Sequence, residues 1–324
     1  MKAALVTSLS GPDGLVVSDV AEPVAGAGEV VVRVRAAALN FLDTLITRGK
    51  YQYRPALPFS PAAELAGEVA ALGPGVTGLA VGERVCGYVV AGGAREKVAV
   101  KAEMLTKVPD RVSDVVASGL SVTYGTAMHG LGDRGALKAG ETLAVLGAAG
   151  GAGLAAVEVA KLTGARVIAV ASSAEKLALC RAHGADDLLD YATSDLKQGL
   201  RDLTAGKGPD VIYDCVGGAH AEAALRSLAW AGRFLVVGFA AGAIPRIPLN
   251  LVLLKNCDVR GIVWGEMAVR EPLRQRAHME RVLDWVGHGQ LKPHIHATFP
   301  LARIADALRV LDQRAALGKV IVTL

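Results

Sequence analysis

The sequence has few aromatic residues, few cysteines and little net charge. Aromatic residues make up 4% of the 324 residues, and the formal net charge is +4. So small a positive charge, with no basic run interleaved with aromatic residues, gives no reason to expect a nucleic-acid partner. The cysteines include no C-x-x-C pair, and each lies in or beside an apolar run, so we expect buried free thiols in a reducing cytoplasm. They are Cys86, Cys180, Cys215 and Cys257.

The sequence also lacks a recognisable signal peptide and a membrane-spanning segment. The apolar run at the N-terminus, Lys2–Val6, is too short for a signal peptide. The most apolar region after residue 230 is interrupted by charged residues and prolines, so it does not span a membrane. We expect a cytoplasmic protein with no membrane partner. The length predicts about two domains, and a hydrophobic content of 52% allows a large core.

Residues 1 to about 118 predict a mostly-β domain. Short runs of strand-forming residues alternate with glycine and proline turns such as Gly11–Gly14 and Gly73–Gly75. Long helical patterns are absent from this part of the chain. The predicted strands are Lys2–Val6, Leu15–Val20, Glu29–Ala38, Gly67–Leu72, Arg84–Val90 and Arg95–Val100.

From about Leu120 the pattern changes to alternating strands and helices, which predicts an α/β domain. Its central stretch, Thr142–Lys176, contains a strand, a glycine-rich turn (Gly147–Gly153), a helix and a second strand. Glycines let the backbone approach a pyrophosphate, and the N-terminus of the helix carries unsatisfied N–H groups. Six strands are enough for a doubly wound parallel sheet. They are Thr142–Leu146, Arg166–Ala171, Asp187–Asp190, Asp210–Cys215, Arg233–Gly238 and Asp258–Val263.

The end of the second strand indicates which dinucleotide binds. An NAD site usually has an Asp or Glu there, which accepts a hydrogen bond from the ribose 2′-OH. This chain has no acid on the strand and continues with Ser172 and Ser173. We expect Ser172 and Lys176 to bind a 2′-phosphate, and Glu175 to form a capping box with Ser172. The plainer alternative for Lys176 is a solvated helix lysine.

The last sixty residues predict only four elements. These are helices at Glu271–Val286 and Leu301–Gln313 and strands at His294–Phe299 and Lys319–Leu324. Four elements are too few for a third domain, so we expect them to return to the first. Residues 1–119 and 265–324 would then form one domain, and residues 120–264 the nucleotide-binding domain.

Several motifs, in this order, resemble the zinc-independent quinone oxidoreductases of the medium-chain dehydrogenase/reductase superfamily. The resemblance extends over nearly the whole chain and implies a GroES-like domain built from both chain ends, a Rossmann domain and a homodimer. The motifs include NFLDTLITRGKY (Asn40–Tyr51), AAGGAG (Ala148–Gly153), SSAEK (Ser172–Lys176), DVIYDCVGG (Asp210–Gly218) and GKVIV (Gly318–Val322).

The same resemblance implies that no metal is bound. Zinc-dependent relatives have a Cys where this chain has Asn40, and a His of a Gly-His-Glu motif where it has Ala63. The lobe of four closely spaced cysteines that holds structural zinc is also missing. His294 and His296, with His288 nearby, form the only metal-like cluster, and no third ligand is evident there.

The resemblance further implies the site residues. Asn40 would hydrogen-bond near the nicotinamide with Asp43 beside it, and Tyr51 would line the substrate pocket. The plainer alternatives are a helix-surface charge for Asp43 and a core aromatic for Tyr51. The other residues implied to bind the cofactor are Thr123, Gly150, Gly151, Ala152, Ser172, Lys176, Tyr191, Val216, Phe239, Trp264, Arg314 and Lys319.

The expected function is NADPH-dependent hydride transfer to a quinone or another electron-poor conjugated acceptor, without zinc. Such an acceptor needs little help, because its product anion is delocalised and its proton can come from water or Tyr51. An enoyl-thioester or 2-alkenal reductase is one alternative, and a non-catalytic nucleotide- or RNA-binding protein is another. We expect the apolar segment Ala243–Leu254 to form the contact of the homodimer.

Overall fold

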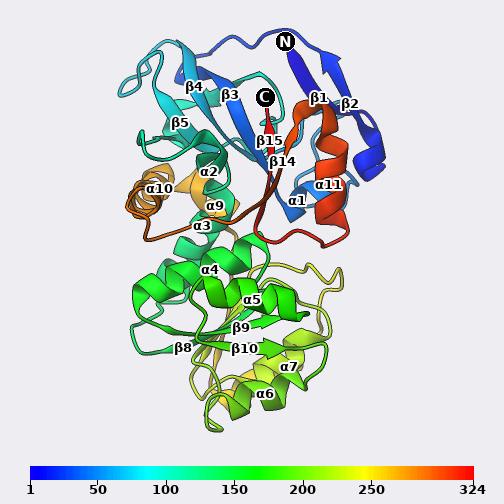
Figure 1. Cartoon of the computed structure of the whole chain (residues 1–324), viewed down its shortest axis with the longest axis vertical. Helices are drawn as coiled ribbons and strands as arrows, with labels where there is room; N and C mark the ends of the chain where they lie inside the picture. The colour runs from blue at the N-terminus through cyan, green and yellow to red at the C-terminus, as the bar shows by residue number, and fades with distance from the viewer. The chain divides into compact units, whose positions relative to one another are not determined.

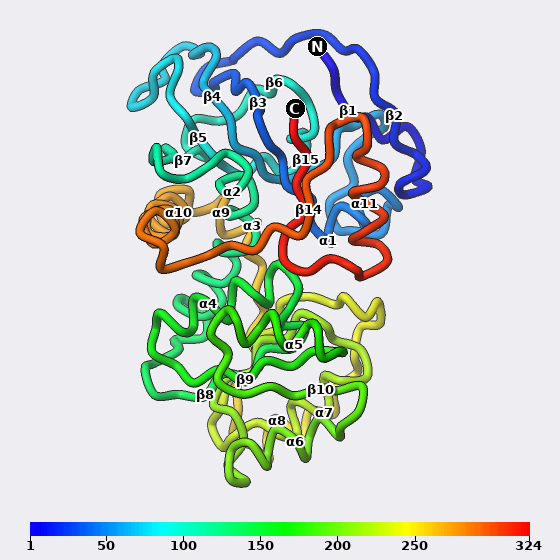
Figure 2. The backbone as a smooth tube through the Cα atoms, in the orientation of Figure 1, coloured from blue at the N-terminus to red at the C-terminus, as the bar shows by residue number.

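The computed structural model describes all 324 residues, which divide into two compact units. Unit 1 comprises Met1–Gly125 and Gly265–Leu324, and unit 2 comprises Thr126–Trp264. The C-terminal segment belongs to unit 1 because β15 (Lys319–Thr323) pairs antiparallel with β3 (Glu29–Leu39). Figure 2 shows this pairing as a red strand beside a blue one.

Unit 1 is built on a seven-stranded sheet with the order β14-β15-β3-β4-β5-β7, in which β6 also pairs with β3. Strands β1 and β2 form a separate hairpin. The core gathers the inward-facing side chains of β3, β4 and β15 under helix α11. The bounds are β1 Lys2–Val6, β2 Leu15–Asp19, β4 Glu64–Leu72, β5 Arg84–Tyr88, β6 Lys97–Lys101, β7 Leu105–Lys107, β14 Ile295–Pro300, α1 Phe41–Ile46, α2 Asp114–Ser118, α3 Ser121–Ala127, α9 Trp264–Arg270, α10 Pro272–Gly287 and α11 Ile304–Asp312, with 3-10 turns η1 Gly11–Gly14, η2 Ala102–Met104 and η4 Leu301–Arg303.

Unit 2 is a six-stranded, fully parallel sheet with the order β10-β9-β8-β11-β12-β13. Helices α4 and α5 lie on one face and α6 and α7 on the other (Figure 1). This order reverses between β8 and β11, so the fold is the predicted doubly wound sheet, and its crevice lies at that reversal. The bounds are β8 Thr142–Leu146, β9 Arg166–Ala171, β10 Asp187–Asp190, β11 Val211–Asp214, β12 Arg233–Val236, β13 Asp258–Gly261, the π-helix η3 Met128–Arg134, α4 Gly151–Thr163, α5 Ala174–Ala182, α6 Leu196–Asp202, α7 His220–Ser227 and α8 Leu249–Lys255.

Sequence patterning finds every strand of the two sheets except β7, but it does not predict α8. This helix has leucines on both its buried and its exposed sides: Leu251 is buried, whereas Leu249 is 80% exposed and Leu253 78%. An apolar run without a polar face shows no helical periodicity. None of the helices combines the length and the apolar character needed to cross a membrane.

Candidate functional site

The glycine-rich turn of unit 2 joins β8 to α4. Gly147 has a φ of +73°, and a Cβ on Gly153 would lie 2.2 Å from the Gly147 carbonyl oxygen, so this close approach requires glycine. Helix α4 starts after Gly150, which offers no side-chain cap. The N–H groups of its first turn, which include Gly151 and Ala152, are therefore available to an anionic ligand.

The segment after β9 carries a lysine without a carboxylate partner. Lys176 donates from Nζ to Ser172 Oγ at 3.1 Å, and both side chains are half-buried. The predicted capping box of Ser172 and Glu175 is wrong, because the helix is capped by Ser173, whose Oγ accepts from Lys176 N at 3.3 Å. Ser172 is thereby free to hold the lysine side chain at the end of the strand.

Tyr191 follows β10 at the same edge of the sheet. Its ring lies 4.5 Å, centroid to centroid, from the ring of His220 at the start of α7. His220 was not among the predicted site residues, and one histidine in a helical stretch carries no sequence signal of its own. The contact between the two rings joins the segment after β10 to the start of α7.

Asp214 fixes the loop after β11. Its Oδ1 accepts from Val216 N at 2.8 Å and from Gly217 N at 2.9 Å, and burial raises the pKa of the carboxyl. The Val216 side chain in turn lies against Gly147. Asp214 is a second residue that the prediction did not name, although an acid that ends an apolar strand is a signal for such a role.

The remaining predicted cofactor residues are dispersed over the two units. Phe239 lies against Gly217 in unit 2, and Trp264 is buried at the start of α9. In unit 1, Thr123 is buried and donates to Gly119 O at 2.9 Å, and Arg314 follows α11 with a φ of +56°. Their contact with a cofactor stays a prediction.

Asp43 of unit 1 is buried and holds a strained loop. Its Oδ2 accepts from Asn40 N at 2.8 Å and its Oδ1 from Ala62 N at 3.0 Å. Ala62 has a φ of +67°, a conformation that costs a non-glycine residue about 1–2 kcal/mol, and the hydrogen bond offsets part of that cost. Burial raises the pKa of Asp43 to about 6. The helix-surface interpretation of this residue is therefore wrong.

A buried lysine lies beside Asn40. Lys319 Nζ donates to Glu64 Oε1 at 2.7 Å, to Asn40 Oδ1 at 2.5 Å and to Leu39 O at 3.4 Å. Lys319 is 4% exposed and Glu64 is fully buried, at 0%. All three N–H bonds of the ammonium group are used within this cluster, and the contact of Lys319 with a cofactor stays a prediction. The prediction did not include Glu64. A sequence signal for it exists, because Glu64 is the one charged residue in the apolar stretch 61–67.

Two tyrosines of unit 1 have raised pKa values, and the charge of Asp43 contributes to both. Tyr51 packs against the apolar cluster around Ile46 and Phe59, and burial, followed by the charge of Asp43, raises its pKa. Tyr88 is paired directly with Glu64 in the β4–β5 ladder, so the two side chains share a face of the sheet. Burial raises the pKa of Tyr88 as well, and it is a further polar residue absent from the prediction.

Comparison with known proteins identifies the family. Residues 26–110 match the alcohol dehydrogenase GroES-like domain and residues 151–286 the zinc-binding dehydrogenase domain. A quinone oxidoreductase-like protein 2 homolog of Nematostella vectensis is 39% identical over 92% of this chain and 82% of its own length. The chain belongs to the quinone oxidoreductase family of medium-chain dehydrogenases/reductases. It is therefore an oxidoreductase.

Two solved members of this group match the whole chain. A mycobacterial protein in complex with NADPH is 31% identical, with a TM-score of 0.93 over 100% of both chains. The Escherichia coli quinone oxidoreductase in complex with NADPH is 25% identical, with a TM-score of 0.94 over 100% of both chains. These matches confirm the predicted fold of this quinone oxidoreductase family member, in which a GroES-like domain accompanies a Rossmann domain.

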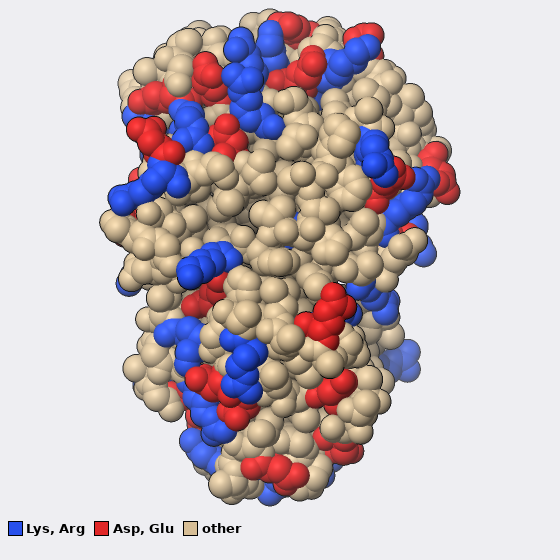
Figure 3. Space-filling view, viewed as in Figure 1, with Lys and Arg blue, Asp and Glu red and all other residues tan.

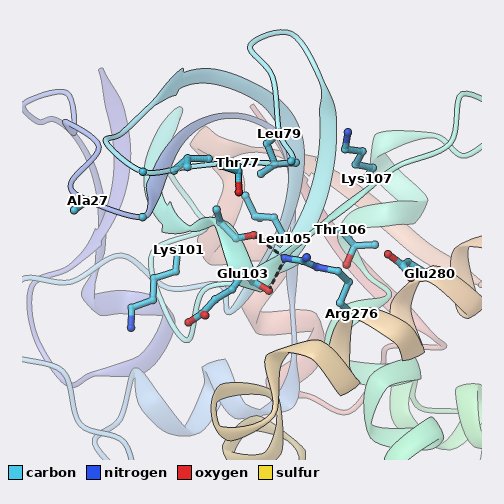
Figure 4. Close-up of a pocket in the computed structure, with 15 residues that line it drawn as sticks. Ala27, Thr77, Leu79, Lys101, Glu103, Leu105, Thr106, Lys107, Arg276 and Glu280 are labelled. Carbon is cyan, nitrogen blue, oxygen red and sulfur yellow. Dashed lines mark hydrogen bonds between the residues drawn. The ribbon is translucent and has the colours of Figure 1, made fainter.

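The cavity shown in Figure 4 is lined by other residues, all of unit 1. It measures about 690 Å³ and is enclosed by η2, β7, the turn at residues 75–79 and helix α10 of unit 1. Arg276 reaches into it from α10 and donates to the carbonyl oxygens of Ala102 and Glu103, at 3.3 Å each. It shares no residue with the candidate site of the oxidoreductase.

Lys, Arg, Asp and Glu side chains are interspersed on the face of the protein shown in Figure 3.

Proposed function

We propose that this quinone oxidoreductase family member is an NADPH-dependent reductase of a quinone or another electron-poor conjugated acceptor. The observation that carries the proposal is Lys176, a cation without a carboxylate partner, held by Ser172 after a strand that ends without an acid. A 2′-phosphate fits this arrangement, whereas an NAD site would have a carboxylate. The NADPH complexes of the two solved relatives support it.

The chain's own groups divide the binding of the cofactor between them. The backbone of Gly150, Gly151 and Ala152 would hold the pyrophosphate at the start of α4. Lys176, Ser172 and Tyr191 would hold the 2′-phosphate. Thr123, Val216, Phe239 and Trp264 would line the rest of the molecule. When bound, NADPH supplies the hydride.

The residues proposed for the acceptor, Asn40 and Tyr51, would orient the substrate. The negative charge that develops on the acceptor is stabilised by delocalisation over its conjugated system. Asn40 presents an amide, and Tyr51 presents a phenol. The phenol is protonated at neutral pH, because its ordinary pKa is about 10 and burial raises it. A neutral phenol can donate a hydrogen bond to the acceptor, while the proton that completes the product comes from water or from Tyr51. A conjugated acceptor requires no metal in this scheme, because its anion is delocalised.

The test is to titrate NADPH and NADH separately into the purified, chelator-treated protein and then add a quinone, an enone or an enoyl thioester. We expect tight binding of NADPH, weaker binding of NADH and oxidation of NADPH on addition of the quinone. Preference for NADH would contradict the assignment of Lys176. Turnover with the thioester and none with quinones would favour the enoyl reductase alternative, and turnover only after zinc is added would refute the metal-free scheme.

The proposal includes a homodimer formed through unit 2. Strand β13 is an edge of the sheet, with unpaired backbone groups, and Leu249, Leu253 and Leu254 of α8 are 80%, 78% and 67% exposed. An open sheet edge and an apolar helix surface in the same unit each suit a second copy of the same chain. Sedimentation should show a dimer that Leu253→Glu dissociates. Leu273→Glu, at a leucine of α10 that is 75% exposed, is the control and should leave it intact. A monomeric wild type would refute this part.

A further inference from the structure

The amide of Asn40 has a fixed orientation. Its Oδ1 accepts from Lys319 and its Nδ2 donates to Glu64 Oε1 at 2.8 Å. A flipped amide would place NH₂ against the ammonium group and the oxygen against the carboxylate, and both contacts would be repulsive. The charges on either side therefore select one of the two rotamers.

One N–H of Asn40 remains without a partner in the structure. Nδ2 carries two hydrogens, and Glu64 Oε1 takes one. Asn40 is also the most exposed of the three residues, at 8%, against 4% for Lys319 and 0% for Glu64. The second Nδ2 hydrogen of Asn40 is thus the one polar side-chain hydrogen of the cluster that no hydrogen bond uses.

The surrounding contacts make this cluster rigid. The other oxygen of Glu64, Oε2, accepts from Val122 N at 2.8 Å, so neither oxygen of the carboxylate is free to turn. Backbone N–H of Asn40 is held by Asp43. A donor held in place before the reaction stabilises a developing charge without reorganising, which is the requirement for an oxyanion-stabilising group.

We infer that Lys319 and Glu64 are positioning residues that hold the Asn40 amide so that its free N–H donates to the acceptor oxygen on which negative charge develops. The inference rests on the proposed function. Hydride addition to a quinone leaves one oxygen as an oxyanion, which takes a proton from water to complete the hydroquinone, while NADPH is oxidised to NADP⁺. The hydrogen bond from Asn40 strengthens as this charge appears.

The first experiment separates positioning from mere stability. Lys319→Met, Lys319→Arg, Asn40→Ala and the control Lys107→Met are assayed with NADPH and 1,4-benzoquinone, well below their unfolding temperatures. Lys107 also pairs with a glutamate, Glu83, at 2.6 Å, but on the surface. We expect Lys319→Met and Asn40→Ala to lower kcat by about 10- to 100-fold with an unchanged Kd for NADPH. Lys319→Arg should recover part of the loss, and Lys107→Met should match the wild type.

A second measurement needs no turnover. The absorbance of 4-nitrophenol reports its ionisation, so its pKa in the presence of each protein shows whether the site stabilises an oxyanion. We expect the wild type and Lys107→Met to lower that pKa and Asn40→Ala and Lys319→Met to lose the effect. Because Lys319→Met leaves Glu64 uncompensated, the double variant Lys319→Met/Glu64→Gln serves if the single variant does not fold.

The outcomes distinguish this inference from the proposed function. A wild type that oxidises no NADPH with any acceptor refutes the proposed function, while the nitrophenol measurement still decides the inference. A folded Lys319→Met variant with wild-type kcat and wild-type nitrophenol pKa overturns the inference and leaves the proposed function in place.

Discussion

Removal of the Lys176 charge should convert an NADPH-selective site into an unselective one. In Lys176→Met the stem of the side chain is retained, and only the ammonium group beside Ser172 is lost. A hydrogen bond to a charged group contributes about 1.5–3 kcal/mol, which corresponds to about 10- to 150-fold in affinity. Lys176 is only half-buried, so solvent screening favours the lower half of that range.

The measurement is the Kd of NADPH and of NADH, obtained from the fluorescence of the reduced nicotinamide at low and high salt. We expect NADPH to bind at least tenfold more weakly to Lys176→Met and NADH to bind within twofold of the wild type. The preference of the wild type for NADPH should narrow as salt rises. Lys207→Met, which removes an equal charge that pairs with Asp210, is the control. The reasoning would be refuted if Lys176→Met weakened the binding of NADPH and NADH equally. It would also be refuted if Lys207→Met weakened the binding of NADPH.

Two further predictions concern the residues that shape the site. Asp43→Asn should make the unfolding free energy less dependent on pH. The fold raises the pKa of Asp43 from 3.8 to about 6, so the stability that protonated Asp43 contributes is fully present below pH 4. About 3 kcal/mol of the unfolding free energy is then lost as the pH rises through 6. The wild type should thus lose its advantage over Asp43→Asn between pH 4 and 7.5 in urea titrations, and a constant difference would contradict the burial argument. Gly153→Ala forces a Cβ against Gly147 O, so we expect about 1–3 kcal/mol of destabilisation and weaker binding of both cofactors. Gly132→Ala, where the added Cβ meets nothing within 4 Å, should do neither, and equal effects in thermal melts would refute the steric argument.

The sheet of unit 2 could be predicted because its strands are buried on both faces. β8, β9 and β11 consist almost entirely of buried apolar residues, so each appears in the sequence as a short apolar run between turns. The right-handed crossovers between successive parallel strands set the face of the sheet on which each helix lies. Strand β7 has three residues, two of them buried, which is too short a pattern to stand out.

The residues proposed for the nucleotide lie close together in the sequence, whereas those that surround Asn40 do not. The nucleotide-binding signals are local: they are glycines, a missing acid and a lysine within a short stretch of sequence. The sequence did not show which of the two adjacent serines caps α5 and which contacts the lysine; in the structure Ser173 is the cap. The pair of Lys319 and Glu64 joins residues 255 apart in the chain. Only the pairing of β3 with both β4 and β15 brings them together, and no local pattern encodes that register.

The Lys319 cluster of unit 1 and the Lys176 segment of unit 2 follow one physical rule. Burying a polar group is unfavourable unless it is paired, so a fold saturates its buried donors and acceptors. Around Lys319, three N–H bonds meet three acceptors, and both oxygens of Glu64 are taken. Within this cluster one N–H of Asn40 has no partner, and in unit 2 Lys176 has Ser172 but no carboxylate as its partner. A cluster held by its own hydrogen bonds can offer its remaining donor to a ligand without rearranging. In the proposed function, that donor of unit 1 binds the acceptor oxygen, and Lys176 of unit 2 binds the 2′-phosphate.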